Sequence, residues 1–294
     1  PRDWAGRSAQ AISDHIVSRA HNGAIVVMHL SAANTAAAIP SLAARLRDRG
    51  YELVTVSQML KGDRLFFDVS ASGEVGDAIA RMASLGFMSG YNSDYFGPWD
   101  SITRAQVAKV STLVGGVHTA EVENVAAPVF PDVPLYRDAK GAPVPYPFDF
   151  VQEAAAAGLV VGKFDDNGTL IFDPYRPITR VQLATILARM ARQLKGYPAT
   201  AAEAGLSEVT FPDVPAYAAA DVSLVATLGL MTGSGSGAAR SFQPWSGAVR
   251  AQVAVAMSRY MDLAPYVAPS VVEDPPQSAD PPVSQSLPEG AAAE

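Results

Sequence analysis

The sequence predicts a multidomain protein: three mainly α-helical repeats follow a short, incomplete α/β segment and precede a disordered, Pro-rich tail. In the 294-residue chain, a pattern of G-x-x-x-G, then an aromatic-x-Pro, then an Arg six residues after that Pro occurs three times. Such self-similarity indicates a repeat architecture. Residues 1–62 instead show short apolar runs between helical patterns, and residues 264–294 are rich in Pro, Ala, Ser and acidic side chains.

Two apolar runs in residues 1–62 predict β-strands. The runs are 24–28 and 53–56, and continuous apolar runs are typical of parallel strands that are buried on both faces. Helical patterns precede and separate them, which is the order of a parallel α/β sheet. Two strands do not complete a stable sheet, so we expect the core of this segment to be incomplete.

Helix signals fill the rest of this segment. Ser8 begins a helix that carries three apolar residues, and Thr35 is placed to cap a helix over 36–49 that Gly50 ends. Ser57 opens a last short helix. The apolar residues expected at helical spacing are Ile12, Ile16 and Val17 in the first helix and Ile39, Leu42, Ala43 and Leu46 in the second.

The repeats are predicted to contain two helices each. Repeat one covers 64–118, repeat two 128–195 and repeat three 209–263. Each opens with an aromatic and an Asp-Val pair, and the first Gly of G-x-x-x-G ends its first helix. Both glycines of the pattern are expected to be turn residues with positive φ, and close approach of a ligand to the backbone is an alternative that the sequence leaves open. The pattern residues are Gly86, Gly90, Phe96, Pro98 and Arg104; Gly158, Gly162, Phe172, Pro174 and Arg180; and Gly229, Gly233, Phe242, Pro244 and Arg250.

Apolar positions define the first helix of each repeat, and one repeat carries an insertion. Residues 138–147 of repeat two are rich in Pro and Gly and are expected to form a surface loop. The apolar residues expected to face the core are Ala78, Ile79, Met82 and Leu85 in repeat one, Phe150, Val151 and Ala154 in repeat two, and Val222, Val225 and Leu228 in repeat three.

The second helix of each repeat has a distinct start signal. Thr103 with Gln106, and Thr179 with Gln182, form capping boxes, in which hydroxyl and amide side chains satisfy two backbone N–H groups at the helix start. Repeat three keeps the Gln but has Val249 in place of Thr. The N-terminus of its helix is therefore expected to be less stable by about 1 kcal/mol.

An Arg follows each cap, although a cation at a helix N-terminus opposes the helix dipole by about 0.3–1 kcal/mol. These residues are Arg104, Arg180 and Arg250. One explanation is an anion: free N–H groups and an Arg side chain suit a carboxylate well. The other is an ion pair that holds the repeat together, to the Asp of the same unit. Those partners would be Asp68, Asp132 and Asp213.

The aromatic-x-Pro elements combine two kinds of aromatic residue. The Phe before each Pro is expected to fill the core. The aromatic after each Pro could stack on a sugar ring or fill the core, and the residues alone leave both open. These residues are Trp99, Tyr175 and Trp245.

The histidines give no metal site. His29 follows the first predicted strand, where α/β folds place catalytic groups, and a structural role is an equal alternative. His15, His21 and His118 show no metal-ligand spacing, and neither H-E-x-x-H nor H-x-x-x-H occurs. We therefore expect no metal-binding residues and no cofactor in this chain.

Composition excludes several classes. A net charge of −7 and a pI near 5.1 argue against nucleic acid as a partner. No run approaches about 18 uninterrupted apolar residues, so no membrane span is expected. The lack of Cys excludes a disulfide scaffold and a Cys-based zinc site. The chain begins at Pro1 without an initiator Met, so we expect a processed protein or a piece of a longer one.

The three repeats resemble S-layer homology (SLH) domains. The resemblance rests on the F-x-D-V openings, the G-x-x-x-G, the F-x-P and the segments 102–106 and 178–182. It implies a mainly helical pseudo-trimer, packed within one chain, that binds secondary cell-wall polysaccharide, often through the carboxylate of a pyruvate ketal. It also implies that Arg104, Arg180 and Arg250 contact the ligand. Because of Val249, repeat three is expected to form the weakest binding groove.

Residues 1–60 resemble the C-terminal end of a polysaccharide deacetylase (NodB-like) domain, a distorted β/α-barrel. The matching residues are Asp3-Trp4 and the segments 23–29, 35–40 and 50–60. The resemblance implies that His29 acts as a catalytic acid. The metal-binding Asp and H-x-x-x-H of that family lie upstream of the matched part. A divalent metal such as Zn is therefore expected for an intact parent enzyme, a hydrolase of C–N bonds other than peptide bonds, and this chain alone is predicted to be inactive.

Together these features predict a secreted bacterial cell-surface protein, anchored non-covalently to the wall by three SLH domains and carrying the remnant of a deacetylase domain. Two alternatives stay open. The chain could be a structural S-layer or adhesion protein with no enzymatic role. It could also be a deacetylase that is completed by a missing upstream half or by a partner chain.

Overall fold

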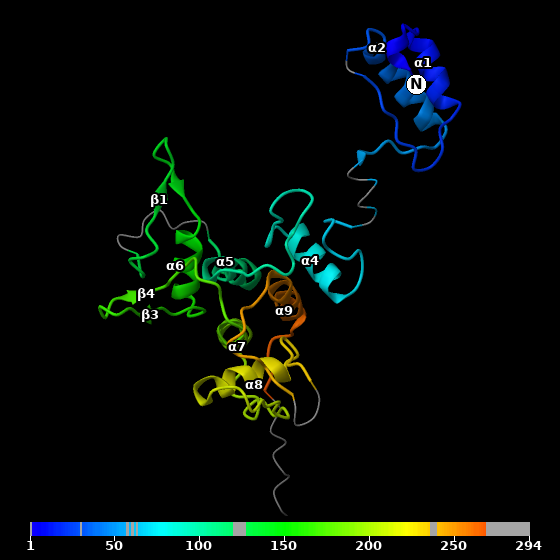
Figure 1. Cartoon of the computed structure of the whole chain (residues 1–294). Coiled ribbons are helices and arrows are strands. Elements are labelled where there is room, and N and C mark those ends of the chain that lie inside the picture. Colours follow the sequence, from blue (N-terminus) through cyan, green and yellow to red (C-terminus); the bar gives the residue numbers. More distant parts are fainter. Residues whose placement is uncertain are drawn as a thin grey trace, which may run out of the picture.

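The computed structural model describes residues 2–29, 31–56, 59, 62, 64–119, 128–235 and 240–268 (Figure 1). Within these ranges the protein is mostly helical, with two small hairpins, as the helical repeats predict. The buried apolar residues fall into two separate clusters, one in residues 9–51 and one in the repeats. Most of the predicted disordered tail, from residue 269 onward, lies outside the described residues, as does most of the short helix expected from Ser57.

The N-terminal unit contains a short 3-10 helix, η1 (Asp3–Ala5), followed by α1 (Ala9–Val17) and α2 (Thr35–Asp48). Ser8 caps α1 as predicted, because its hydroxyl accepts the N–H of Ala11 at 3.2 Å. The two helices pack through one small core of fully or nearly buried side chains. Its members are Ile12, Ile16, Val17, Ala38, Leu42 and Leu46.

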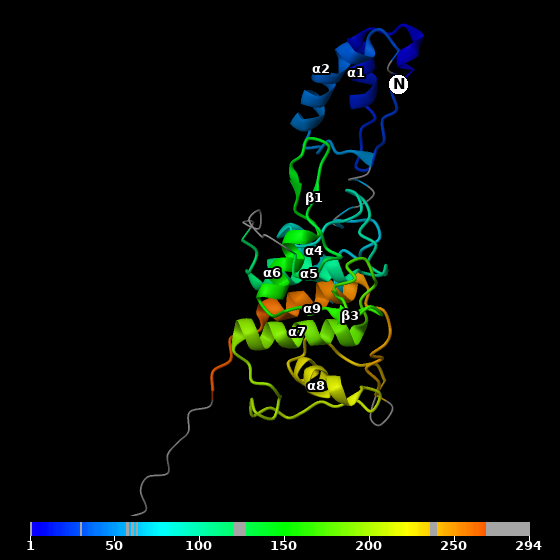
Figure 2. The same ribbon diagram turned by 90° about the vertical axis from the view of Figure 1, so that its left-hand side faces the viewer.

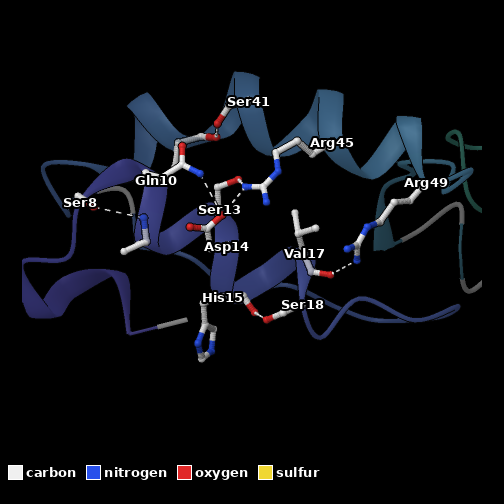
Figure 3. Close-up of polar contacts among 12 residues, drawn as sticks. Ser8, Gln10, Ser13, Asp14, His15, Val17, Ser18, Ser41, Arg45 and Arg49 are labelled. Carbon is white, nitrogen blue, oxygen red and sulfur yellow. Dashed lines mark hydrogen bonds and ion pairs between the residues drawn. The ribbon is translucent and has the colours of Figure 1, made fainter.

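Polar contacts flank this core on the α1–α2 face (Figure 3). Arg45 of α2 donates to the hydroxyl of Ser13 and to the carboxylate of Asp14, both at 2.8 Å. Arg49 donates to the carbonyl of Val17 at 2.6 Å. The second Arg thus binds a carbonyl at the C-terminal end of α1, where such groups lack helical partners.

The two predicted strands of this unit are not formed. Residues 24–28 and 53–55 have no regular structure, and neither segment pairs with a strand among the described residues. Ile25 and Val27 are 57% and 66% exposed. Together with the two helices, both segments line a cavity of about 1040 Å³. The apolar runs are as expected, but a strand needs hydrogen-bonded neighbours, and these residues supply none.

The second helix also differs from prediction in two respects. Thr35 is its first residue rather than its cap, and the preceding Asn34 makes no side-chain cap bond. The Thr35 side chain is buried and donates to Asp3 instead. Ile39, expected in the core, is 47% exposed, because it lies outside the face of α2 that packs on α1 and, among the described residues, no sheet covers it.

Each repeat contains a shorter first helix and a second helix that follows the Arg. The first helices are α4 (Glu74–Ser84), α6 (Phe148–Ala156) and α8 (Ala219–Thr227), and a 3-10 turn, η3 (Ala216–Ala218), precedes α8. The second helices are α5 (Arg104–Gly115), α7 (Arg180–Lys195) and α9 (Arg250–Asp262). All six helices lie where the sequence pattern places them.

The helices pair across the repeats rather than within them. The second helix of repeat one, α5, packs on α6 of repeat two; α7 packs on α8 of repeat three; and α9 packs on α4 of repeat one. The helices α5, α7 and α9 also contact one another, and Figure 1 shows them in the middle with α4, α6 and α8 outside. Figure 2 shows α7 and α9 from the side, between α4 and α8.

Two hairpins project from repeat two. In the first, β1 (Tyr136–Arg137) pairs with β2 (Pro143–Val144), so part of the loop expected over 138–147 is a short antiparallel ladder. In the second, β3 (Lys163–Phe164) pairs with β4 (Leu170–Ile171). The Asp138 and Asp165 side chains accept N–H groups across the two turns, which shapes both loops locally.

The two glycines of each G-x-x-x-G have different roles. Gly86, like its counterparts in repeats two and three, follows the first helix with positive φ, as predicted. The second glycine does not have positive φ, so that part of the prediction is wrong. At Gly162 an added Cβ would lie 2.6 Å from the Phe130 ring and 2.6 Å from the carbonyl of Ile171. The second glycine is therefore required for close packing.

The core of the repeats follows the predicted aromatic pattern. Phe96, Phe172 and Phe242 are almost completely buried. Each packs at 5.4 Å, ring centre to ring centre, on the Phe that opens its own repeat. In repeat one that partner is Phe66 rather than the adjacent Phe67. The predicted core residue Leu85 is 48% exposed because α4 ends one residue before it.

Candidate functional site

Each repeat uses an Asp to hold the loop that carries its aromatic-x-Pro element. Asp68 accepts the N–H groups of Phe96 and Gly97 at 2.9 and 2.7 Å. Asp132 and Asp213 hold the equivalent loops through the same two N–H groups, at 2.6–2.9 Å. Carboxylates that accept backbone N–H groups make strong, orienting bonds, so these three residues have a structural role.

Each Arg reaches out of its own repeat into another. Arg104 donates from Nε to the carbonyl of Phe172 at 2.8 Å and from Nη2 to that of Val161 at 3.3 Å. Arg180 makes the same two bonds to repeat three, both at 2.9 Å, and Arg250 makes them to repeat one, at 3.0 and 2.5 Å. We call these sites junction 1–2, junction 2–3 and junction 3–1.

The junctions share one geometry. At junction 1–2, the backbone of Phe172 is held on both sides: Asp132 accepts its N–H, and Arg104 binds its carbonyl. The guanidinium carbon of Arg104 also lies 4.6 Å from the centre of the Phe172 ring. The equivalent distances at junctions 2–3 and 3–1 are 4.8 and 4.3 Å. The stacked cation and the two hydrogen bonds fix each loop against the start of a helix.

The first two N–H groups of each of these helices are not free, so the expectation that they bind an anion is wrong. The N–H groups of Arg104 and Ala105 donate to the carbonyls of Arg176 and Pro174 at 3.0 and 2.9 Å. The same pair of bonds recurs at the starts of α7 and α9. Carbonyl oxygens from a neighbouring repeat therefore satisfy the positive end of each helix dipole.

The alternative explanation, an ion pair within the repeat, is not what the structure shows either. Among the described residues, the hydrogen-bond acceptors of Arg104 lie in repeat two, whereas Asp68 accepts backbone N–H groups of repeat one. Burial is the main cause that lowers the pKa of Arg104, while Asp173 and Asp132 oppose it. Burial likewise lowers the pKa of Arg180 and Arg250. All three remain cationic.

The predicted capping boxes are confirmed in two repeats. Thr103 and Thr179 accept the N–H of the residue three positions on, and Gln106 and Gln182 accept the N–H of the cap in return. In repeat three, only the return bond is present, from the N–H of Val249 to Gln252 at 3.2 Å. Val has no side-chain acceptor, so the capping box of this helix lacks the bond from the Gln252 N–H to the cap side chain.

The aromatic residues after each Pro lie at the surface. Trp99, Tyr175 and Trp245 are 70%, 59% and 64% exposed. Their alternative role as core residues is therefore wrong. Exposed aromatic faces at equivalent places in three repeats are available to stack on a ligand, and that role stays a prediction.

A second polar cluster lies in the N-terminal unit. Asp3 is buried and accepts the backbone N–H of His29 at 2.7 Å and the hydroxyl of Thr35 at 2.7 Å; its other oxygen lies 2.9 Å from Nδ1 of His29. The hydrogen bond from the His29 backbone is the largest cause that holds the pKa of Asp3 well below its usual value. The side chain of His29 itself is 51% exposed.

Asp3 is the residue of this cluster whose role the sequence did not reveal. The sequence singles out Asp3 only as part of the Asp3-Trp4 pair, and no periodicity or spacing connects it to His29. The contact joins residues 26 positions apart and forms because η1 and the loop before α2 meet there. The cluster orients one His and contains no second imidazole.

Metal-ligating side chains do not gather in the parts of the chain that the structure describes. No group of three His, Cys, Asp or Glu side chains suited to a metal ion occurs there. None of the described helices combines the length and the apolar character that a membrane crossing requires.

Comparison with known families supports the predicted resemblance for the first repeat. Residues 66–108 match the S-layer homology domain. The matched part runs from the opening Phe66 through the Asp68 loop and the Phe96-x-Pro element to the first turns of α5. It therefore contains one copy of each part of the repeated backbone frame, by which we mean the Asp-held loop and the Arg at the helix start.

Three proteins illustrate what the chain is similar to. A peptidoglycan-N-acetylglucosamine deacetylase of Bacillus cereus is 38% identical over 64 residues, 21% of this chain and 30% of that protein. A surface-layer 125 kDa protein of Lysinibacillus sphaericus is 28% identical over 138 residues, 47% of this chain and 11% of that protein. A peptidoglycan-N-acetylmuramic acid deacetylase of Bacillus subtilis is 36% identical over 59 residues, 20% of this chain and 13% of that protein. The chain thus spans less than a third of the length of these relatives.

Proposed function

We propose that residues 64–263 are three SLH repeats, arranged as a pseudo-trimer, that anchor this protein non-covalently to secondary cell-wall polysaccharide at the bacterial cell surface. The observation that carries the proposal is the threefold recurrence of the frame that lies within the matched residues 66–108. The Asp-held loop, the Arg link and the exposed aromatic occur in all three repeats. The 138-residue similarity to a surface-layer protein, longer than any one repeat, supports more than one such domain.

The proposed binding residues retain unused hydrogen-bonding capacity. Arg104 and Arg180 use Nε and Nη2 for the inter-repeat bonds. Among the described residues, Nη1 of each makes no hydrogen bond, and this is the edge that we propose for a carboxylate of the glycan, such as a pyruvate ketal. Trp99, Tyr175 and Trp245 provide the exposed aromatic faces for sugar rings.

Sedimentation with purified wall polysaccharide tests the anchor. The intact chain should co-sediment with the polysaccharide and should lose binding once the pyruvate ketals are removed. Trp99→Ala and Trp245→Ala should each weaken binding about threefold to tenfold, because stacking of a sugar ring on an aromatic side chain contributes about 1 kcal/mol to the binding free energy. Tyr217→Ala is the matched control, since Tyr217 is 75% exposed but lies outside the repeated element. A wild-type chain that stays in the supernatant would overturn the proposal.

We further propose that residues 1–62 correspond to the C-terminal part of a deacetylase domain. The Asp3–His29–Thr35 cluster favours this, together with the two deacetylase similarities, whose 64 and 59 residues are close to the size of the segment. With Nδ1 facing Asp3, the Nε2 atom of His29 is the one available for proton transfer. The metal of an intact parent enzyme, a divalent ion such as Zn, would be held by residues other than those described here.

This second proposal has a direct measurement. The chain should not release acetate from acetylated peptidoglycan, whereas a longer form that supplies the metal ligands should do so, and His29→Ala should abolish that release. Asp3→Asn in the longer form should lower kcat with little change in KM, because it disturbs the orientation of His29 rather than substrate binding. Release of acetate by the present chain at a comparable rate would contradict the proposal.

A further inference from the structure

The three junctions share a backbone frame but differ at three equivalent side-chain positions. The first position follows the second Gly of G-x-x-x-G, the second follows the buried Phe, and the third lies two residues after the Pro. Junction 1–2 has Lys163, Asp173 and Arg176; junction 2–3 has Ser234, Gln243 and Ser246; and junction 3–1 has Tyr91, Gly97 and Asp100. Each position lies within two residues of a backbone carbonyl that binds the Arg of its junction, or carries that carbonyl itself.

Junction 1–2 gathers cations at the surface. Lys163 and Arg176 lie 2.7 and 3.6 Å from Asp173, and the Arg176 side chain is 64% exposed. The backbone carbonyl of Arg176 also accepts the N–H of Arg104, which places the two arginines side by side. Asp173, Arg176 and Asp132 act electrostatically on Arg104. Lys163 and Arg176 both pair with Asp173, so the three compared positions carry two cations and one carboxylate and add a charge of +1 to this junction.

Junction 2–3 has no charged side chain at the three compared positions, and a further cation of the same repeat, Arg240, lies 5.2 Å from the centre of the Phe211 ring. Gln243 donates from Nε2 to the hydroxyl of Ser234 at 3.0 Å, so these two polar side chains satisfy each other. Asp213, which holds the loop, is the charge that acts on Arg180. The three compared positions therefore add no charge to Arg180 and Asp213 at this junction.

Junction 3–1 is covered. The guanidinium of Arg250 lies between two rings, 4.3 Å from the centre of Phe96 and 5.1 Å from that of Tyr91, and Arg250 is only 6% exposed. At Gly97 an added Cβ would lie 2.4 Å from the Tyr91 ring and 2.4 Å from the Asp100 carboxylate. Glycine at this position therefore allows both side chains to close over the Arg, whereas the other junctions have a side chain there.

Charge at junction 3–1 also opposes an anion. Asp100 hydrogen-bonds to Tyr91 and, after burial, is the next cause that raises the pKa of that hydroxyl, which keeps Tyr91 neutral and in place. Asp100 and Asp68 both act on Arg250. Of the three compared positions only Asp100 is charged, so they add a charge of −1 to this junction, and the ring of Tyr91 lies over the guanidinium of Arg250 at 5.1 Å.

We propose that the three junctions are unequal anion sites: junction 1–2 is the principal site for a carboxylated saccharide, junction 2–3 is a weaker one, and Tyr91 with Asp100 closes junction 3–1. Arg176 is then a specificity-determining residue, because it presents a second, exposed guanidinium beside Arg104. This inference rests on the proposed polysaccharide anchor and assigns the ligand to a particular pair of repeats.

Calorimetric titration of the full chain tests the ranking. The probe is purified secondary cell-wall polysaccharide with its carboxylates intact, and the control ligand is the same material with its carboxylates reduced to alcohols. Arg176→Ser gives junction 1–2 the residue that junction 2–3 carries, and it should weaken binding about threefold to tenfold, the effect of one exposed charge-assisted contact. Arg137→Ser removes the same charge from the β1–β2 hairpin, away from the junctions, and should leave affinity within about twofold.

A gain-of-binding variant tests the closed junction independently. Tyr91→Ser together with Asp100→Ser gives junction 3–1 the two residues of junction 2–3 and should raise the number of bound carboxylate groups per chain. Circular dichroism and thermal unfolding should verify the fold of each variant. Should the double variant unfold, the exposed Arg176→Ser still decides the ranking.

The outcomes separate the two proposals. If the wild-type chain binds neither ligand, the polysaccharide anchor itself is wrong. If it binds only the carboxylated form, but Arg176→Ser behaves like Arg137→Ser, the anchor stands and the ranking of the junctions is overturned. If Arg176→Ser alone weakens binding and the double variant gains sites, both proposals are supported.

Discussion

Replacing Val249 with Thr should stabilise the chain, because it supplies the missing half of a capping box. Val249 has an extended backbone, with φ −106° and ψ 160°, close to the φ −85° and ψ 161° of both Thr103 and Thr179. Gln252 already accepts the N–H of Val249 at 3.2 Å. A hydroxyl at position 249 would lie where the N–H of Gln252 can donate to it, as the two other boxes do at 3.3 and 3.4 Å.

The expected magnitude follows from the geometry and from the near-identical shapes of Val and Thr. Restoring an N-cap acceptor contributes about 0.5–2 kcal/mol. The existing cap bonds are long, at 3.3 and 3.4 Å, so we expect the lower part of that range, about 0.5–1 kcal/mol. For a folded region of this size, that corresponds to a rise in Tm of about 1–4 °C.

Differential scanning calorimetry of the full chain measures the effect against two matched variants. Thr103→Val and Thr179→Val remove the hydroxyl from an intact box and should each lower Tm by a similar amount. If both Thr variants lose stability while Val249→Thr gains none, the reasoning is refuted. The half-buried methyl group of Val249 would then contribute as much through packing as a hydroxyl contributes by capping.

Two further predictions concern packing and pH. Gly162→Ala should destabilise the fold by about 1–3 kcal/mol in urea denaturation, because its Cβ would strike the Phe130 ring and the Ile171 carbonyl. Gly247→Ala, which meets no atom within 4 Å, should change stability by less than about 0.5 kcal/mol. Burial raises the pKa of Tyr260 from 10.0 to about 12, so folding stability should fall as the pH rises from 10 through 12. Tyr260→Phe should remove that alkaline loss in pH-dependent unfolding curves; an unchanged pH profile would show that another group causes it.

Local features of the chain are predictable because each depends on a few neighbouring residues. The capping box of Thr103 and Gln106 involves atoms three residues apart, and the end of α4 near Gly86 needs only one residue with positive φ. The burial of Phe96 follows from its apolar character. The matched domain at 66–108 rests on the same local elements.

The strands of the N-terminal unit show where local patterns fail. The apolar runs at 24–28 and 53–56 carry the composition of buried strands, but strand formation depends on hydrogen bonds to other segments. Ile25 and Val27 are consequently exposed beside a cavity rather than buried in a sheet. The contact of Asp3 with His29 likewise depends on two segments meeting in space.

The sequence by itself determined that this chain has three helical repeats, where their helices start and end, and that an Arg follows each start. Only the tertiary structure decided what those arginines do. Arg104, Arg180 and Arg250 bind carbonyls 68, 62 and 154 residues away, in another repeat, and the same carbonyl-bearing loops occupy the helix N–H groups. The physical reason is that a buried guanidinium and a helix start take whichever acceptors the packed neighbours present, and spacing within one repeat does not specify those neighbours.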